Sequence, residues 1–305
     1  MTSTTPAIHT QDLAKRYGKT VALRALTMTV ERGQAFGFLG PNGAGKTTAV
    51  KLLLGLARPT GGEAWLLGAR IGDRRARQRV GYLPELFRYQ QWLSAREVLA
   101  FHCELAMLER STWRPEIART LETVGLTARA DDRVAGFSKG MQQRLGLAVS
   151  LIGSPELVVL DEPTSALDPV GRVDVRRIIG ELRERGTTVF LNSHLLTEVE
   201  RVCDRVAIVD RGEVIASGAV TDLAGEPAVR LRVTGLDPAG RSSLSVFGTV
   251  RDEGEWLQVR GLRDGAVPDL VAEIVRRGGR VYAVEPQHRT LEERFIELVG
   301  ERERT

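Results

Sequence analysis

Cysteine is almost absent from this sequence of 305 residues, which contains only Cys103 and Cys203. The two lie far apart, and neither belongs to a Cys-x-x-Cys pair. The sequence therefore argues against a disulfide-stabilised scaffold and against a cysteine zinc site. We expect both residues to behave as small buried hydrophobic side chains, as is typical of a protein in a reducing cytosol.

Long apolar runs are also absent. No stretch approaches the roughly 20 apolar residues that a helix needs to span a bilayer. The longest apolar tract, residues 145–160, is interrupted by Gly-Ser-Pro at 153–155. Residues 1–6 have neither the charged nor the apolar region of a secretory signal. We therefore expect neither a secretory signal nor a membrane-spanning helix in this sequence.

Lysine is rare, because only five of the 43 basic residues are lysines and the others are arginines. Against 39 acidic residues this leaves a net charge of +4, which permits a nucleic-acid or membrane-surface partner without requiring one. Residues 70–79, with five arginines and one aspartate, account for this excess, and residues 225–305, with 13 basic and 14 acidic residues, contribute none. We expect residues 70–79 to form a solvated arginine-rich face, or one that lies near anionic lipid headgroups.

The composition is that of an ordinary folded protein, with 42% hydrophobic and 27% charged residues. Apolar strands and amphipathic helices alternate through the first 224 residues, which predicts βαβ units and a mainly parallel sheet. The strands are predicted at 35–39, 157–160, 188–191 and 205–209, and the helices at 46–56, 94–108, 116–124, 138–152 and 169–185. Ser94 and Glu97 form a capping box, and Pro115 is expected to open the helix at 116–124.

The pattern changes near residue 225, where Gly-Glu-Pro at 225–227 is typical of a linker. Beyond it, strands are predicted at 229–233, 246–251, 256–259 and 280–284, with helices at 238–244 and 267–277. This β-α-β-β-α-β order predicts a small ferredoxin-like domain. A last helix begins at Thr290, which forms a capping box with Glu293. We therefore divide the chain into a domain at 1–224 and an accessory α+β domain at 225–305.

A glycine-rich segment after the first predicted strand matches the phosphate-binding pattern GxxxxGK[ST] at every fixed position. Its residues are Gly40, Pro41, Asn42, Gly43, Ala44, Gly45, Lys46 and Thr47, and Thr48 follows them in the candidate binding set. Glycines let successive backbone N–H groups turn toward phosphates, and the next helix adds partial positive charge at its N-terminus. Lys46 can reach the β- and γ-phosphates, and the Thr47 hydroxyl can ligate Mg²⁺. A glycine-rich turn with a chance lysine is the alternative.

Two acidic residues end the predicted strand at 157–160. A strand beside the phosphate loop would carry Asp161 to Mg²⁺ and Glu162 to the attacking water, and hydrolysis requires both of these roles. By itself this pattern is weak, because many apolar strands end in acidic residues where they meet solvent.

Three further segments accompany this strand: Phe-Ser-Lys-Gly-Met at 137–141, Ser-Ala-Leu-Asp at 165–168, and His194 after the next strand. With these motifs in order, residues 7–224 strongly resemble the ATP-binding cassette (ABC) family, specifically the nucleotide-binding subunit of an ABC transporter. The resemblance implies an α/β fold, a P-loop NTPase-like cassette with a mainly parallel core sheet, a helical subdomain at about 93–136 and an antiparallel subdomain. The small ferredoxin-like α+β domain would follow this cassette.

The family signature, usually Leu-Ser-Gly-Gly-Gln, corresponds here to residues 137–141, in which only Ser138 and Gly140 match. The candidate contacts of this segment are Ser138, Lys139, Gly140 and Met141. In the family this motif and the loop of Asp168 face the partner subunit, which implies a head-to-tail dimer holding two ATP molecules. Ser138 and Asp168 are also explained as helix N-caps.

Three other residues gain roles from the resemblance. His194 corresponds to a histidine that contacts the γ-phosphate, which a ring N–H could do. Tyr17 corresponds to an aromatic residue that stacks on adenine. Glu85 takes the place of a glutamine that touches Mg²⁺ and links the site to the membrane subunit. Its carboxylate also suits a hard cation, although it adds negative charge. The alternatives are a structural histidine and an ordinary tyrosine on the surface or in the core.

The variants around Glu85 and at 137–141, together with the C-terminal domain, are similar to those of type-2 exporters, which move drugs, antibiotics, lipids or polysaccharides, or mediate drug resistance. The resemblance therefore implies an Mg²⁺-dependent ATPase subunit that powers an exporter through a separate integral-membrane subunit. It would pair with a second copy or a related ABC subunit at the cytoplasmic face of the cell membrane, with no nucleic-acid partner. The segment at 93–136 and the loop of Glu85 would form the docking surface.

Three alternatives stay open. An importer subunit of the same family would typically carry glutamine in place of Glu85. An ABC ATPase that acts on ribosomes or DNA would usually contain two cassettes or a long coiled coil, and neither is found here. A regulatory module that binds nucleotide but barely hydrolyses it is opposed by the presence of both Asp161 and Glu162.

Overall fold

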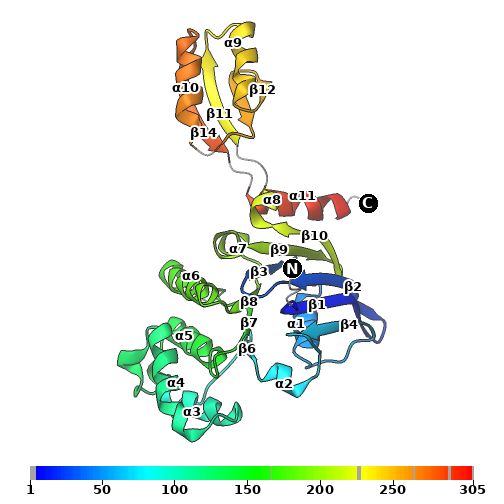
Figure 1. Ribbon diagram of the computed structural model, residues 1–305, viewed down its shortest axis with the longest axis vertical. Helices are drawn as coiled ribbons and strands as arrows, with labels where there is room; N and C mark the ends of the chain where they lie inside the picture. Colours follow the sequence, from blue (N-terminus) through cyan, green and yellow to red (C-terminus); the bar gives the residue numbers. More distant parts are fainter. Residues whose placement is uncertain (1–4, 166, 225–227, 264, 288–289, 304–305) are drawn as a thin grey trace. The chain divides into compact units, whose positions relative to one another are not determined.

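The computed structural model describes residues 5–165, 167–224, 228–263, 265–287 and 290–303 (Figure 1). The chain divides into two compact units, Met1–Gly218 and Ala219–Thr305. The linker expected at 225–227 lies outside the described residues. None of the helices in the described ranges combines the length and the apolarity needed to cross a membrane.

The first unit is built on a six-stranded sheet with the order β10-β9-β3-β8-β7-β6 (Figure 1). Its strands are β3 (Ala35–Leu39), β6 (Val80–Leu83), β7 (Leu157–Asp161), β8 (Thr188–Asn192), β9 (Arg205–Asp210) and β10 (Glu213–Ala219). Neighbours from β9 to β6 pair in parallel. Every residue of β3, β7 and β8 is buried, which explains their continuous apolar runs. The predicted parallel sheet is confirmed.

A second, antiparallel sheet has the order β2-β1-β4-β5. It consists of β1 (Ile8–Tyr17), β2 (Thr20–Val30), β4 (Gly61–Leu66) and β5 (Ala69–Arg70). Buried residues of this sheet share one hydrophobic core with β3, β8, β9 and the helix α1 (Lys46–Leu53). This core holds the start of α1, and therefore the phosphate loop before it, against both sheets.

The other helices of this unit are α2 (Arg74–Arg77), α3 (Ala95–Leu105), α4 (Arg110–Thr123), α5 (Lys139–Ser150), α6 (Pro169–Glu184) and α7 (Leu196–Val202). Short 3₁₀ turns at Thr127–Arg129 and Val134–Gly136 connect α4 to α5. The capping box of Ser94 and Glu97 at α3 is confirmed. Figure 1 shows α3, α4 and α5 together beside the β6 edge of the sheet.

The predicted start of α4 is wrong, because the helix begins at Arg110 and Pro115 lies inside it. The first turn is held by the Thr112 hydroxyl, which donates to the Glu109 carbonyl at 2.7 Å. Pro115 lacks the N–H that would continue the helical hydrogen bonds at this point. The helix is nevertheless kept in place by Ile117 and Leu121, which are buried further along it.

The second unit contains an antiparallel sheet with the order β12-β13-β11-β14. Its strands are β11 (Ala228–Thr234), β12 (Thr249–Glu253), β13 (Trp256–Arg260) and β14 (Arg280–Gln287), and its helices are α8 (Val220–Ala224), α9 (Pro238–Ser243), α10 (Val267–Arg276) and α11 (Leu291–Glu303). This confirms the predicted β-α-β-β-α-β order, although residues 244–246 form a 3₁₀ turn and the strand expected from 246 begins at Thr249. The capping box of Thr290 and Glu293 is also present.

Candidate functional site

The glycine-rich loop joins the end of β3 to the start of α1 and depends on two glycines for steric reasons. A Cβ on Gly40 would lie 2.2 Å from the carbonyl oxygen of Val209, on the neighbouring strand β9. Gly45 has φ +99, and a Cβ there would lie 2.3 Å from the carbonyl oxygen of Ala22. Neither position accepts a side chain, so the loop closes tightly over the sheet.

Lys46 is buried at the first position of α1. Its Nζ donates to the carbonyl oxygens of Gly40 at 2.7 Å and Pro41 at 3.3 Å. Burial lowers the pKa of Lys46, while the nearby carboxylates of Glu162, Asp161 and Glu85 act to raise it. The ammonium group is therefore held inside the curve of the loop, where it faces the acidic residues at the strand ends.

Asp161 ends β7 beside Asn192, which ends β8 in the parallel register. The Asn192 amide donates to one oxygen of the buried Asp161 carboxylate. Burial raises the pKa of Asp161, and Glu85 and Glu162 add to this effect, whereas the Asn192 hydrogen bond and Lys46 oppose it. Asn192 was not predicted as a site residue. Its position two residues before His194, at the end of an apolar strand, was the signal available in the sequence.

Glu162 follows β7 in a left-handed backbone conformation, φ +52, which is rare for residues other than glycine. Its N–H donates to the Asn192 carbonyl at 2.8 Å, and its carbonyl accepts from the Ser165 hydroxyl at 3.1 Å. These bonds hold the unusual conformation. The buried side chain lies 2.8 Å from Nδ1 of His194. Since an ionised carboxylate can only accept, Nδ1 donates and Nε2 of the half-exposed ring faces away from this bond.

These groups meet in one cavity of about 240 Å³ at the carboxyl edge of the parallel sheet. The residues that line it are Asn42, Lys46, Thr47, Glu85, Asp161, Glu162, Asn192 and His194. The parallel topology explains the meeting, because β3, β7 and β8 all end at this edge. Seven of these eight residues were predicted from the sequence.

The oxygen donors of this cavity fit a hard divalent cation. No cluster of three or more His, Cys, Asp or Glu side chains that could hold a metal is found in the described residues. Thr47, Asp161 and Glu85 instead supply one hydroxyl and two carboxylates, a set typical of Mg²⁺ that keeps water and phosphate ligands. The buried Oδ1 of Asn192 has no hydrogen-bond partner in the described structure, and a cation with its water ligands would satisfy it.

Twelve predicted contact residues do not line this cavity. Six of them belong to the phosphate loop and the start of α1: Gly40, Pro41, Gly43, Ala44, Gly45 and Thr48. The other six lie elsewhere in the sequence: Tyr17, Ser138, Lys139, Gly140, Met141 and Asp168. Tyr17 is exposed at the end of β1, with the ammonium of Lys15 4.8 Å from its ring centroid. Ser138 and Asp168 cap α5 and α6, through bonds of 3.2 Å from the Met141 N–H and 2.7 Å from the Gly171 N–H. Their capping roles are therefore present within one chain.

Among the residues that the structure describes, none gives Gly140 a steric reason to be glycine. A Cβ there would meet nothing nearer than Leu167 Cδ2 at 3.8 Å, an ordinary contact. Glycine in a helix costs roughly 0.5–1 kcal/mol relative to alanine. Sterics within the described residues therefore do not require glycine at this position.

We predict that Asp161→Asn increases the free energy of unfolding of the nucleotide-free protein by about 1 kcal/mol. Its melting temperature should therefore rise. Folding raises the pKa of Asp161 above its ordinary value of 3.8, so the ionised carboxylate destabilises the folded state at pH 7. The penalty is lost as the pH falls through the raised folded-state pKa, and it is absent below 3.8, where the carboxyl is mostly protonated in both states. Asparagine keeps an oxygen for the Asn192 bond and removes the charge.

Thermal unfolding at pH 7 and at lower pH measures this effect, with the exposed Asp222→Asn as the control. The difference between variant and native protein should narrow as the pH falls. A lower melting temperature for Asp161→Asn at pH 7 would contradict the predicted sign.

Comparison with known proteins adds family evidence to this geometry. The family model described as "ABC transporter" matches residues 23–165, and a model described as "AAA domain, putative AbiEii toxin, Type IV TA system" matches residues 132–200. An uncharacterised ABC transporter ATP-binding protein of Nostoc is 39% identical over 98% of this chain and 91% of its own length. The ABC transporter match includes the phosphate loop and both carboxylates, whereas the AAA-domain match includes the carboxylates alone.

Two relatives carry names that state a process. The linearmycin resistance ATP-binding protein of Bacillus subtilis is 32% identical over 96% of this chain and 98% of its own length. The Nod factor export ATP-binding protein I of Burkholderia orbicola is 36% identical over 95% of this chain and 96% of its own length. A solved ATP-binding subunit of an ABC transporter superposes with a TM-score of 0.65 and 29% identity, and covers 71% of this chain and 91% of that one.

Proposed function

We propose, because the chain belongs to the ATP-binding subunits of the ABC transporter family, that it hydrolyses Mg²⁺–ATP to power an exporter whose membrane-spanning part is a separate chain. The family is one of ATPases, so nucleotide binding and hydrolysis come with membership. Our proposal adds the metal, the roles of single residues, the direction of transport and the partner.

One observation carries the catalytic part of this proposal: Lys46, Asp161, Glu162 and His194 converge on one cavity beside the glycine-rich loop. The four side chains come from three loops that the parallel sheet brings to one edge. A cation, a metal-binding carboxylate and a buried general base are the groups that phosphoryl transfer to water requires.

Each residue then has a defined task. The loop N–H groups and Lys46 would bind the phosphates, with the ammonium exchanging the Gly40 and Pro41 carbonyls for phosphate oxygens. Glu162 would orient the attacking water and accept its proton. His194 donates from Nδ1 to Glu162, so the other ring nitrogen is available to a γ-phosphate oxygen. Thr48 and Tyr17 would contact the nucleotide outside the cavity.

Thr47, Asp161 and Glu85 would hold Mg²⁺, which supplies charge neutralisation of the phosphate oxygens when bound. Asn192 holds the Asp161 carboxylate in place through its amide. Glu85 contributes a negative charge at the position where the loop of the wider family usually carries glutamine. We expect this charge to change metal affinity without removing the oxygen ligand.

Five of the residues that do not reach the cavity belong to a proposed dimer. Ser138, Lys139, Gly140, Met141 and Asp168 would face the nucleotide of a second subunit, either another copy of this chain or a related ABC subunit. The glycine at 140 without a steric reason supports this placement. ATP binding would close the two subunits on each other, and hydrolysis with product release would open them.

Export is proposed from the relatives, whose names state linearmycin resistance and Nod factor export. The energy would drive alternating access in a membrane subunit, and this chain would then lie at the cytoplasmic face of the cell membrane. The transported class would be drugs, antibiotics, lipids or polysaccharides.

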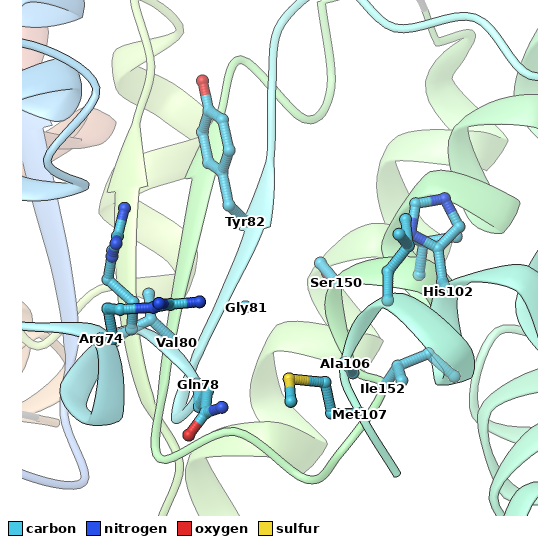
Figure 2. A pocket seen from close by; sticks show the side chains of 13 residues that line it. Arg74, Gln78, Val80, Gly81, Tyr82, His102, Ala106, Met107, Ser150 and Ile152 are labelled. Atoms are coloured by element: carbon cyan, nitrogen blue, oxygen red, sulfur yellow. The ribbon is translucent and has the colours of Figure 1, made fainter.

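A groove of about 480 Å³ is the proposed docking site for the membrane subunit (Figure 2). Arg74 and Arg77 of α2 and strand β6 form one wall, and the ends of α3 and α5 form the other. Leu105 and Met107 at its rim are 61% and 72% exposed. Two arginines of the 70–79 segment therefore line this groove, while Arg70 and Arg79 pair with Glu63 and Glu156.

The groove is linked to the nucleotide cavity through β6. A Cβ on Gly81 would lie 1.8 Å from the Ser150 carbonyl oxygen, so β6 packs directly against the end of α5. Glu85 follows β6 by two residues and lines the nucleotide cavity. A partner seated in the groove would thus act on Glu85 through a single rigid strand.

We predict that Leu105→Asp combined with Met107→Asp abolishes recovery of the membrane partner and leaves the intrinsic ATPase rate unchanged. The reason is that two apolar contacts are lost and two charges must be desolvated in the interface. Leu56→Asp is the matched control, since Leu56 is 63% exposed and lies outside the groove. Equal recovery by the variant and the control would contradict the docking site.

Affinity purification of the tagged chain from solubilised membranes tests the proposed function as a whole. Recovery of an integral-membrane protein in stoichiometric amount supports it. Recovery of a solute-binding protein with it would favour an importer. Retention on ribosomes or DNA that weakens with salt, without any membrane protein, would show that the chain is not a transporter subunit.

A further inference from the structure

In the second unit the helix α10 packs on one face of the sheet, and among the described residues no helix is seen to share a hydrophobic core with the other, helix-free face. Val229 and Leu231 of β11 and Leu257 and Val259 of β13 point into the core that α9 and α10 cover. Residues alternate along strands, so the intervening positions share the other face. Most of these positions hold exposed or partly exposed arginines, glutamates and a tryptophan, whereas Gln258 of β13 is buried.

The strand register arranges these residues in rows across the sheet. One row runs Arg251, Gln258, Arg230 and Glu285, from the edge strand β12 to the edge strand β14. The next row runs Glu253, Trp256, Arg232 and Ala283 in the same direction. The first row therefore has a positive charge at one edge of the sheet and a negative charge at the opposite edge.

The two edge charges of this row are not paired with any residue that the structure describes. Arg251 and Glu285 are both exposed, and no ion pair to either is found in the described residues. Arg230, in contrast, pairs with Glu253 at 2.9 Å and stacks on Trp256 with its guanidinium carbon 4.8 Å from the ring centroid. The inner residues are thus ordered, and the edge charges remain available.

This pattern is complementary to itself under a two-fold axis. If a second copy of the sheet is laid face to face, with the axis parallel to the strands and between β13 and β11, then β12 lies over β14 of the other copy. Arg251 then faces Glu285 of the second copy, and Trp256 faces Arg232. Every such contact occurs twice, as an isologous interface requires.

Ordinary sheet packing preserves these contacts. Two aligned sheets pack about 10 Å apart with about 30° between their strands. At the edge strands, roughly 7 Å from the axis, this rotation displaces facing residues by about 4 Å, little more than one residue. An arginine side chain reaches across such a displacement.

We propose that this helix-free face is a homodimer interface, through which the second unit pairs with the same unit of a second copy of the chain. Tryptophan and arginine are the residue types that anchor protein interfaces. A polyanion such as nucleic acid or an acidic membrane is a less suitable occupant, because Glu285 lies in the same row as Arg251 and would repel it. The interface needs no nucleotide, so it would keep two cassettes at high effective concentration throughout the ATP cycle.

A charge swap on the full-length chain tests the interface. Arg251→Glu and Glu285→Arg are each expected to raise the dimer dissociation constant about tenfold or more, since each places like charges together twice per dimer. The double variant restores opposite charges at both contacts and should dimerise as the native chain does. Analytical ultracentrifugation in EDTA without nucleotide measures this association apart from any ATP-dependent pairing.

Arg276→Glu is the matched control, because it makes the same charge change on α10, which covers the opposite face of the sheet. It should leave the dissociation constant unchanged. A native chain that stays monomeric without nucleotide overturns the proposal, as does a double variant no better than the single ones. Binding of the native chain to anionic vesicles or to a single-stranded oligonucleotide, lost in Arg251→Glu and not recovered in the double variant, assigns the face to a polyanion instead. The ATPase rates of the same variants are measured in parallel. Unchanged rates would show that the outcome at this face does not bear on the proposed ATPase function.

Discussion

Replacing Glu162 with glutamine is expected to reduce ATP hydrolysis by about 10²-fold or more while ATP binding is retained. The amide has the size of the carboxylate but cannot accept a proton from water. The binding groups, Lys46 and the loop N–H groups, are untouched by the change. Steady-state turnover and equilibrium titration with a fluorescent ATP analogue measure the two properties separately.

The control for this prediction is Glu198→Gln. Glu198 is 7% exposed against 8% for Glu162, and it lies outside the nucleotide cavity, where it pairs with Arg176 at 3.0 Å. Its replacement tests whether loss of any buried carboxylate disturbs turnover through the fold. Unchanged turnover in Glu162→Gln would falsify the assignment of the general base, and an equal loss in both variants would show that the effect is not chemical.

Replacing Lys46 with alanine is expected to weaken ATP binding by about 10²-fold or more. Removing one member of a buried, hydrogen-bonded charge pair costs roughly 2–5 kcal/mol, and each 1.4 kcal/mol is a factor of ten in affinity. Lys46 faces Glu162, Asp161 and Glu85, so its loss also leaves these carboxylates to repel the phosphates. Calorimetric titration with ATP in the presence of Mg²⁺ measures the change.

Lys51→Ala serves as the control, because Lys51 lies one turn further along α1 and is exposed. It removes the same charge from the same helix without touching the loop. If Lys46→Ala binds ATP as tightly as the native chain does, then the loop is not the phosphate site. Since Glu162→Gln should still bind ATP, the two variants together separate binding from hydrolysis.

The phosphate loop was predictable from the sequence because its requirements are local. Gly40 and Gly45 are dictated by close approach of the backbone to β9 and β2, and Lys46 follows at a fixed position in the motif. The strand ends that carry Asp161 and His194 were also predictable, since buried parallel strands produce continuous apolar runs. That these ends lie side by side follows from the parallel topology, which the alternation of strands and helices indicates.

Other features depend on contacts that no local pattern records. Pro115 is expected from the sequence to open α4, but it lies inside the helix. The helix persists around it because Ile117 and Leu121 are buried against the rest of the protein. Asn192 was missed because its role is defined by the neighbouring strand, where Asp161 lies in register with it. The left-handed conformation of Glu162 likewise requires the Asn192 carbonyl and the Ser165 hydroxyl to hold it.

By itself, then, the sequence determined the order of elements, the phosphate loop and the identity of the acidic residues, because these depend on spacing and on residue types along the chain. Only the tertiary structure decided that Glu162 and His194 are hydrogen-bonded. It also decided that a groove lies between α2 and the end of α3, and that Arg251 and Glu285 lie at opposite ends of one row of the sheet. The near-balance of charge in residues 225–305 concealed that row. The reason is physical: the register of a sheet sets which distant residues are neighbours, and composition does not contain it.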